Sequence, residues 1–257
     1  MQMQGNTIFV TGGTSGIGRG MAEAFHHRGN QVIIAGRRKG RLEQICQQNP
    51  GMALFDLDVT NPEEIREVAR EVITKFPKLN CVINNAGVQM QVDFHPDKPL
   101  DDEKLQAEIT TNLLAPIRVT AAFLSHLAKR RAVPEPPSVV INVSSGLAFV
   151  PMARYATYCA TKAAIHSWTL SLRQQLRSSA VQVLELIPPY VATELGGPAK
   201  PVVTSSGRGP MPLDAFIAET MKELESGIEE IAIADAKRLV AATCPENIKK
   251  AFAAMNG

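Results

Sequence analysis

Short apolar runs alternate with segments of helical periodicity over most of the chain. The runs at 7–11, 31–36, 52–57, 80–84, 138–143 and 181–187 are predicted to be strands, and the segments 17–28, 40–48, 62–76, 101–130 and 155–178 are predicted to be helices. The apolar runs at 32–35 and 139–141 contain no polar residue, which is typical of parallel strands covered on both faces. The alternation therefore predicts an α/β fold with a doubly wound parallel sheet.

Two stretches interrupt this alternation. Residues 131–137 are rich in proline and are predicted to be a surface connection, whereas 196–212 are rich in glycine and proline and are predicted to be a mobile lid. A short helix from Leu213, a last strand near 230–234 and a terminal helix should follow the lid. We expect a single domain over residues 1–257, with a lid and substrate loop around 190–225.

Composition and charge narrow the possible partners. The chain has 45% apolar and 20% charged residues, as globular proteins do, and its net charge of +2 does not favour nucleic acid or an anionic membrane. It has no apolar run of about 18 residues and no charged leader, so we expect neither a membrane span nor a signal peptide. The cysteines (Cys46, Cys81, Cys159 and Cys244) lie far apart, which argues against a metal site or disulfides and favours a cytoplasmic location.

The glycine-rich segment 11–18, Thr-Gly-Gly-Thr-Ser-Gly-Ile-Gly, follows a predicted strand and opens a predicted helix. A dinucleotide-binding turn requires this context, because the helix N-terminus then faces the phosphates. Gly12 would permit the tight turn, Gly16 the approach of the pyrophosphate, and Gly18 close helix packing. The spacing is GxxxGxG rather than GxGxxG, and a plain glycine turn is the alternative. The candidate cofactor-binding residues here are Gly12, Thr14, Ser15, Gly16, Ile17 and Gly18.

The end of the second predicted strand indicates which cofactor is bound. An NAD site usually has an acidic residue about 20 positions beyond the glycines, to hold the ribose hydroxyls. Here the strand ends at Gly36 and continues into Arg37 and Arg38, with no acid before Glu43. Arg37 can bind a 2′-phosphate through paired charged hydrogen bonds, and a solvated basic helix start is the alternative. We therefore expect NADP(H) to be preferred over NAD(H), with Arg37 and Arg38 as binding residues.

The spacing of Tyr158 and Lys162 indicates acid/base chemistry. Four residues make about one helical turn, so both side chains lie on one face of a helix. A phenol titrates near ~10 in water, and a nearby lysine cation favours the phenolate, as a general acid/base near pH 7 requires. Tyr155 is the rival tyrosine, but four residues beyond it lies Cys159, which carries no positive charge.

Further polar residues follow other predicted strands. Asp58 and Val59 come after the third strand, and the Asp58 carboxylate could accept a hydrogen bond from the adenine amino group. Asn112 lies inside a helical pattern, where asparagine is unfavourable without a hydrogen-bonding role. Ser145 follows the fifth strand, with Ser144 as its rival. The segment after the fourth strand contributes Asn85, Ala86 and Gly87 at the sheet edge where ligands bind, although it could also be a plain turn.

Taken together, these motifs resemble those of the short-chain dehydrogenase/reductase family, including its bacterial members. The resemblance extends from Thr7 to about Leu195 and rests on the segment 11–18, Asn84-Asn-Ala-Gly87, Asn112, Ser145 and the Tyr158-x-x-x-Lys162 pair. It implies a Rossmann-type, three-layer α/β/α fold with about seven strands in the order 3-2-1-4-5-6-7. It also implies a homodimer or homotetramer.

The resemblance also implies residue roles. Tyr158 would exchange the proton while hydride moves at the nicotinamide, and Ser145 would hold the substrate oxygen. Lys162 would bind the nicotinamide ribose and lower the tyrosine pKa, while Asn112 would anchor a water that relays protons. Val191 and Thr193 match positions that hold the nicotinamide carboxamide, and Pro188 is a further candidate contact. Pro189 replaces the glycine usual in the family, so local geometry is expected to differ there.

The function expected is an NADP(H)-dependent oxidoreductase that interconverts a small-molecule carbonyl and alcohol. The alternatives are an NAD-dependent alcohol dehydrogenase, a non-catalytic dinucleotide-sensing protein and a tyrosine–lysine epimerase. Substrate specificity is expected to lie in the loops 88–99, 147–152 and 196–216.

Overall fold

The computed structural model describes residues 1–129, 136–196 and 209–243. Within these residues a seven-stranded parallel sheet has the order β3-β2-β1-β4-β5-β6-β7, which confirms the predicted Rossmann-type fold. The strands are β1 (Thr7–Thr11), β2 (Gln31–Gly36), β3 (Ala53–Asp56), β4 (Cys81–Asn84), β5 (Ser138–Val143), β6 (Val181–Ile187) and β7 (Glu230–Ala232).

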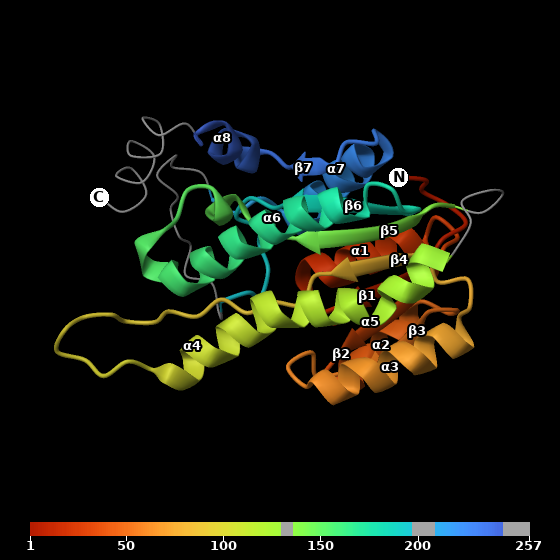
Figure 1. The fold of residues 1–257 in the computed structure, drawn as a ribbon, viewed down its shortest axis with the longest axis horizontal. Coiled ribbons are helices and arrows are strands. Elements are labelled where there is room, and N and C mark those ends of the chain that lie inside the picture. Colours follow the sequence, from red (N-terminus) through yellow and green to blue (C-terminus); the bar gives the residue numbers. More distant parts are fainter. Residues whose placement is uncertain (130–135, 197–208, 244–257) are drawn as a thin grey trace.

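Helices cover both faces of this sheet (Figure 1). They are α1 (Gly16–His26), α2 (Lys39–Gln48), α3 (Pro62–Lys75), α4 (Asp102–Ile109), α5 (Ala115–Lys129), α6 (Ala156–Leu176), α7 (Leu213–Glu225) and α8 (Asp235–Ala241). Two short 3₁₀ turns, η2 (Gly146–Ala148) and η3 (Ala153–Tyr155), lie between β5 and α6. Successive strands are added toward one edge of the sheet from β1 to β3 and toward the other edge from β4 onward. Open α/β sheets bind ligands at this switch point between β1 and β4.

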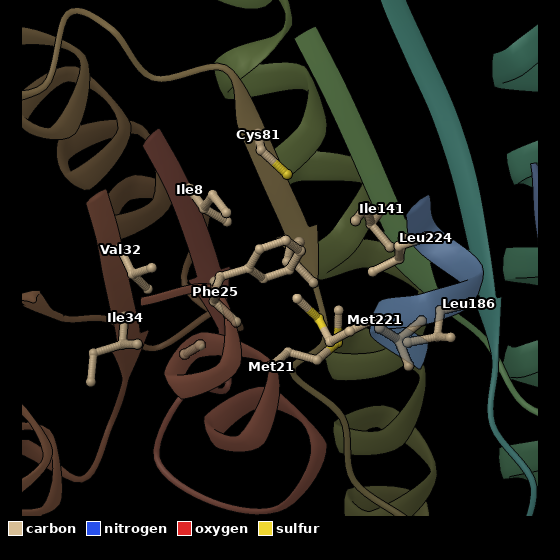
Figure 2. Close-up of a cluster of buried hydrophobic side chains, with 14 of the residues drawn as sticks. Ile8, Met21, Phe25, Val32, Ile34, Cys81, Ile141, Leu186, Met221 and Leu224 are labelled. Carbon is tan, nitrogen blue, oxygen red and sulfur yellow. The ribbon is translucent and has the colours of Figure 1, made fainter. Parts of the chain in front are cut away.

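Alternate side chains of each strand point to opposite faces of the sheet, so the core consists of two hydrophobic clusters. On β1, Ile8 belongs to the cluster under α1, α2 and α7, whereas Phe9 belongs to the cluster under α3 and α5. Figure 2 shows the first cluster, in which Phe25 of α1 and Leu224 of α7 pack over side chains of the strands. In the second cluster the rings of Phe9 and Phe123 lie 5.0 Å apart. Each side chain of this size contributes about 1.5–3 kcal/mol when fully buried.

Helix α3 shows how local sequence sets an element boundary. The Asn61 side chain accepts hydrogen bonds from the backbone N–H groups of Glu63 and Glu64, and Pro62 occupies the first helical position. The acidic side chains of the first turn and Lys75 in the last turn also complement the helix dipole. The predicted start at residue 62 is confirmed for this reason.

The segment predicted as one helix, 101–130, is divided in the structure. Helices α4 and α5 are separated by a π-helical turn, η1 (Thr110–Leu114), so the prediction of a continuous helix is wrong. A π turn inside a helix is rare and occurs mostly at functional sites. Asn112 lies at the centre of this turn.

The structure does not describe residues 197–208, which make up most of the predicted lid (196–212). It also does not describe residues 131–135 of the predicted surface connection. So does any terminal helix beyond residue 243, although α8 follows β7 as expected. Near the described end of the predicted lid, an isolated parallel bridge joins Met211 to Val191. None of the described helices is long and apolar enough to cross a membrane.

Candidate active site

A cleft of about 1360 Å³ lies along the carboxyl ends of the strands. Most residues predicted for the site line it, although they come from segments far apart in the sequence. They are Gly12, Thr14, Ser15, Gly16, Ile17, Arg37, Arg38, Asp58, Val59, Asn85, Ala86, Gly87, Ser145, Tyr158, Lys162, Pro188, Val191 and Thr193. Gly18 and Asn112, which were also predicted for the site, do not line the cleft.

The glycine turn has the backbone conformation that its sequence suggests. Gly12 and Gly16 have φ angles of 68° and 53°, which side chains rarely tolerate. A Cβ on Gly18 would lie 2.3 Å from Asn85 Nδ2 and 2.4 Å from the Gly12 carbonyl oxygen. Gly18 thus serves close packing, but its neighbours are the ends of β1 and β4.

Asn85 ties these two strand ends together. Its Nδ2 donates to the carbonyl oxygens of Thr11 and Gly12, at 3.1 and 3.3 Å. In return, Thr11 Oγ1 accepts from the backbone N–H groups of Asn85 and Ala86, both at 3.1 Å. These bonds fix the floor of the cleft where β1 and β4 meet.

A cluster of cations borders the glycine turn. The Arg37 side chain is 65% exposed, and its guanidinium lies 3.9 Å from the Asp58 carboxylate. The Arg38 guanidinium instead donates to the hydroxyl groups of Thr14 and Ser15, each at 2.6 Å. Arg38 thus contacts the glycine turn directly, whereas Arg37 extends into solvent.

Glu194 is a partner of these arginines that the sequence analysis missed. Its carboxylate binds Arg38 Nη1 at 3.0 Å and Arg41 Nη1 at 2.8 Å. The two arginine hydrogen bonds hold the pKa of Glu194 below its usual value. Its separation of 156 residues from Arg38 left no sequence signal for this contact.

Asp58 uses one carboxylate oxygen locally. Its Oδ1 accepts hydrogen bonds from the backbone N–H and the hydroxyl of Thr60, at 2.9 and 2.8 Å. Asp58 therefore has a fixed orientation in the cleft wall.

Tyr158 is the buried tyrosine of the site, with 5% of its surface exposed. Burial raises its pKa, and a side-chain hydrogen bond with Ser145 opposes that rise. The Lys162 ammonium lies 5.6 Å from the centre of the phenol ring. The lowering of the tyrosine pKa expected from Lys162 is not seen here, because burial of the phenol outweighs the hydrogen bond with Ser145.

Lys162 is equally buried, with 5% of its surface exposed. Its ammonium donates to the Val143 carbonyl oxygen at 2.8 Å. Burial lowers the pKa of Lys162 to about 8, although the carboxylates of Glu108 and Glu185 oppose that shift. A lysine with this pKa can change charge near neutral pH, which is unusual for a structural cation.

Asn112 contacts the cleft from behind. Its side-chain amide binds both the N–H and the carbonyl oxygen of Val88, at 2.9 and 2.8 Å, and donates to Thr161 on α6 at 3.3 Å. The hydrogen-bonding role expected for this asparagine is therefore present. Gly87 fits between Asn112 and Lys162, since a Cβ there would lie 3.3 Å from Oδ1 and 3.8 Å from Nζ.

The rival residues have different surroundings. Ser144 Oγ makes a long 3.5 Å hydrogen bond to the Leu186 carbonyl, whereas Ser145 Oγ accepts from Leu147 N–H at 3.1 Å and bonds Tyr158. Tyr155 also lines the cleft, but it precedes α6 and lies in η3. The serine beside the buried tyrosine is thus Ser145.

Neither a metal centre nor a reactive thiol is found in the described part of the chain. It holds no group of three or more histidine, cysteine, aspartate or glutamate side chains placed to bind a metal ion. Burial raises the pKa of Cys159, whose sulfur contacts the Met152 backbone. Its predicted packing role is consistent with this environment.

His166 contacts a buried acid that the sequence analysis did not identify. Its Nδ1 lies 2.8 Å from the carboxylate of Glu185 on β6, which is fully buried. This contact raises the pKa of His166. Because Glu185 also raises the pKa of Lys162, the pair belongs to the surroundings of the site.

Comparison with known proteins shows the family. The family described as short chain dehydrogenase matches residues 6–202. The chain belongs to the short-chain dehydrogenase family. It is 37% identical to the uncharacterized oxidoreductase DltE of Bacillus subtilis, over 90% of this chain and 89% of that protein. It is 32% identical to L-fucose dehydrogenase of Bos taurus, over 74% of this chain and 68% of that protein.

A solved structure gives the same result. The short chain dehydrogenase of Burkholderia cenocepacia in complex with NADP matches with a TM-score of 0.81 and 25% identity, over 99% of each chain. The expected enzyme class, an NAD(P)-dependent oxidoreductase acting on CH–OH and C=O groups, is confirmed by the family.

Proposed function

We propose that this enzyme is an NADP(H)-dependent oxidoreductase that interconverts a small-molecule carbonyl and alcohol, with Tyr158 as general acid/base. The observation that carries the proposal is the buried group formed by Tyr158, Ser145 and Lys162 in the wall of a cleft that begins at the glycine turn. A dinucleotide-sensing protein would need the turn but not this proton-exchanging group.

The residues of the cleft fit a dinucleotide. The backbone of Gly12 and Gly16 would face the pyrophosphate at the start of α1, and Asp58 and Val59 would border the adenine. Pro188, Val191 and Thr193 would contact the carboxamide end. The bound nicotinamide supplies the hydride chemistry.

The remaining steps belong to the protein. Ser145 would orient the substrate oxygen, and Tyr158 would give its proton to that oxygen in the reductive direction. Lys162 would hold the ribose and stabilise the phenolate that remains. Its neighbour Asn112 would order the proton route by holding the Val88 backbone.

Three arginines next to the glycine turn support NADP(H). No acidic residue lies between Gly36 and Glu43, and Arg37, Arg38 and Arg41 lie where an adenosine phosphate would enter. The NADP complex of the Burkholderia cenocepacia relative agrees with this proposal. An NAD-dependent alcohol dehydrogenase is the alternative, and the carboxylate of Glu194 beside these arginines is the observation that favours it.

The test is a panel of carbonyls and alcohols with NADPH, NADH, NADP⁺ and NAD⁺, followed by the absorbance of the reduced cofactor. Turnover that is faster with the phosphorylated pair is expected. Tight binding of cofactor without turnover on any member of a broad panel would favour a sensor instead.

A further inference from the structure

The carboxylate of Glu194 occupies the centre of the cationic cluster. It binds Arg41 Nη1 through both oxygens, at 3.0 and 2.8 Å, and Arg38 Nη1 through Oε2 at 3.0 Å. Glu194 follows Thr193 directly, at the segment that leaves β6. Arg38 is the N-cap residue of α2, and Arg41 lies in its first turn.

Glu194 also lies between two cavities. It lines the large cleft and an adjoining cavity of about 550 Å³, which Arg41 and Arg19 line as well. The residues shared by both cavities include Thr14 and Ser15, which bind Arg38. The ion pairs of Glu194 therefore form the partition between them, next to the turn that would face the pyrophosphate.

A phosphate monoester would need the same donors. Guanidinium groups bind phosphate and carboxylate with the same fork geometry, and two anions on one pair of arginines repel each other. The arginines hold the pKa of Glu194 below its usual value, so the carboxylate is charged at neutral pH. Since 58% of its side chain is exposed, it can turn outward without loss of buried packing.

We propose that Glu194 is a specificity-determining residue, whose carboxylate competes with the cofactor 2′-phosphate for Arg38 and Arg41 and so reduces the preference for NADP(H). The inference rests on the proposed use of NADP(H) by this cleft. Arg37 makes only a 3.9 Å contact with Asp58 and remains free to bind the phosphate first. Glu194 therefore reduces the preference without abolishing it.

The experiment is to titrate wild type and Glu194→Gln with NADPH and with NADH, followed by the fluorescence of the reduced nicotinamide. Because exposed ion pairs are weak, removing the competing carboxylate should tighten NADPH binding by only about 3- to 10-fold. NADH binding should change by less than about 2-fold, because NADH has no 2′-phosphate. Adding Arg38→Ala to Glu194→Gln should remove most of the gain.

Glu23→Gln is the matched control. Glu23 lines the adjoining cavity and pairs with Arg19 at 2.8 Å, so its substitution makes the same change in net charge near the same turn. It should leave the NADPH-to-NADH ratio of affinities unchanged. An equal gain in Glu23→Gln would reduce the effect to net charge and overturn the proposal.

Two further results would reject competition by Glu194. The first is an NADPH affinity of Glu194→Gln equal to that of wild type. The second is a weaker NADPH affinity, which would show that Glu194 holds Arg38 and Arg41 in place for the cofactor. If wild type bound neither cofactor, the proposed function would fall together with the inference. If Glu194→Gln tightened NADPH binding but no carbonyl were reduced, the inference would stand and the catalytic proposal would fail.

Discussion

Asn112 holds both backbone polar groups of Val88, accepting from its N–H at 2.9 Å and donating to its carbonyl oxygen at 2.8 Å. Val88 directly follows Gly87 and lines the cleft, while Asn112 lies at the centre of the π turn between α4 and α5. The side-chain amide of Asn112 thus links the π turn to the loop that follows β4. The two bonds are partly buried, and Asn112 itself is only 1% exposed.

Asn112→Asp should keep the bond from Val88 N–H and lose the bond to its carbonyl oxygen, whereas Asn112→Ala should lose both. Each buried group left without a partner costs about 1–3 kcal/mol. We expect both variants to unfold at lower urea concentration, and Asn112→Asp to suffer additionally because its carboxylate faces the Val88 carbonyl oxygen. Equal stability of Asn112→Ala and wild type would contradict this account.

Glycine positions offer a paired test of packing. Gly18→Ala places a Cβ within 2.4 Å of the Gly12 carbonyl oxygen and closer still to Asn85, so it should destabilise the protein by more than about 2 kcal/mol. Gly40 lies in α2 with no atom within 4 Å of a Cβ, and Gly40→Ala should stabilise the protein by about 0.5–1 kcal/mol. Thermal unfolding of both variants is the measurement, and the same sign for the two would be inconsistent with the packing described here.

Much of the fold follows from the sequence because the strands and helices are locally coded. Apolar runs such as β5, a cap such as Asn61 and glycines with positive φ all leave local signals. The order of the strands came from the family resemblance. The π turn left no such signal, because one inserted residue does not interrupt the apolar pattern around Asn112.

Parts of the site that depend on distant contacts were not predictable. Glu194 meets Arg38 across 156 positions, and no periodicity reports such a pair. The direction of the Tyr158 pKa shift was missed for a related reason, since helix spacing locates a lysine but does not measure burial. Glu108 was not identified from the sequence, because nothing in its local pattern shows that it is fully buried.

Lys162 should destabilise the folded protein when no cofactor is bound. Its pKa is lowered to about 8 from 10.5, so the folded state binds the proton less tightly than the unfolded state. The cost is complete below pH 8 and disappears as the pH rises toward 10.5. Lys162→Met should therefore raise the free energy of unfolding at pH 7 by about 1–3 kcal/mol and by less at pH 10.

Urea unfolding at the two pH values is the measurement, with Lys222→Met as the control because Lys222 is exposed on α7. The control should change stability little at either pH. A larger gain from Lys162→Met at pH 10 than at pH 7 would mean that the sign of the coupling is wrong.

Glu108 should set the pH range in which Lys162 stays charged. Glu108 Oε1 accepts from Met90 N–H at 2.8 Å, its Oε2 has no hydrogen-bond partner among the described residues, and its charge raises the pKa of Lys162. Glu108→Gln can keep the bond to Met90 but removes the charge. Glu185 on β6 acts in the same direction and remains in this variant, so part of the effect on Lys162 persists.

The measurement is the affinity for NADPH between pH 6 and about 10, where loss of the lysine charge weakens binding. In Glu108→Gln the midpoint of this loss should move to lower pH by at least about 0.5 unit. Glu103→Gln, on the exposed side of the same helix, should leave the midpoint in place. A common midpoint for all three proteins would exclude an electrostatic role for Glu108.

The choice of catalytic tyrosine is tested by two phenylalanine substitutions. Tyr158→Phe removes the exchangeable proton but keeps the ring, so cofactor binding should persist while turnover falls by about 10²–10⁴. Ser145→Ala should lower turnover with little effect on cofactor affinity, and Ser144→Ala should do much less, because only Ser145 bonds the phenol. Lys162→Ala should impair both binding and turnover.

Tyr155→Phe is the decisive control. Tyr155 lines the same cleft but precedes α6, whereas the hydrogen bond with Ser145 is made by Tyr158. It should retain most of the wild-type turnover on any carbonyl that the enzyme reduces. If Tyr155→Phe were inactive and Tyr158→Phe active, the acid/base would have to be reassigned to the residue at the helix start. If both variants kept wild-type turnover, proton transfer by either Tyr155 or Tyr158 would be excluded, and Tyr190 would be the tyrosine of the cleft left to test.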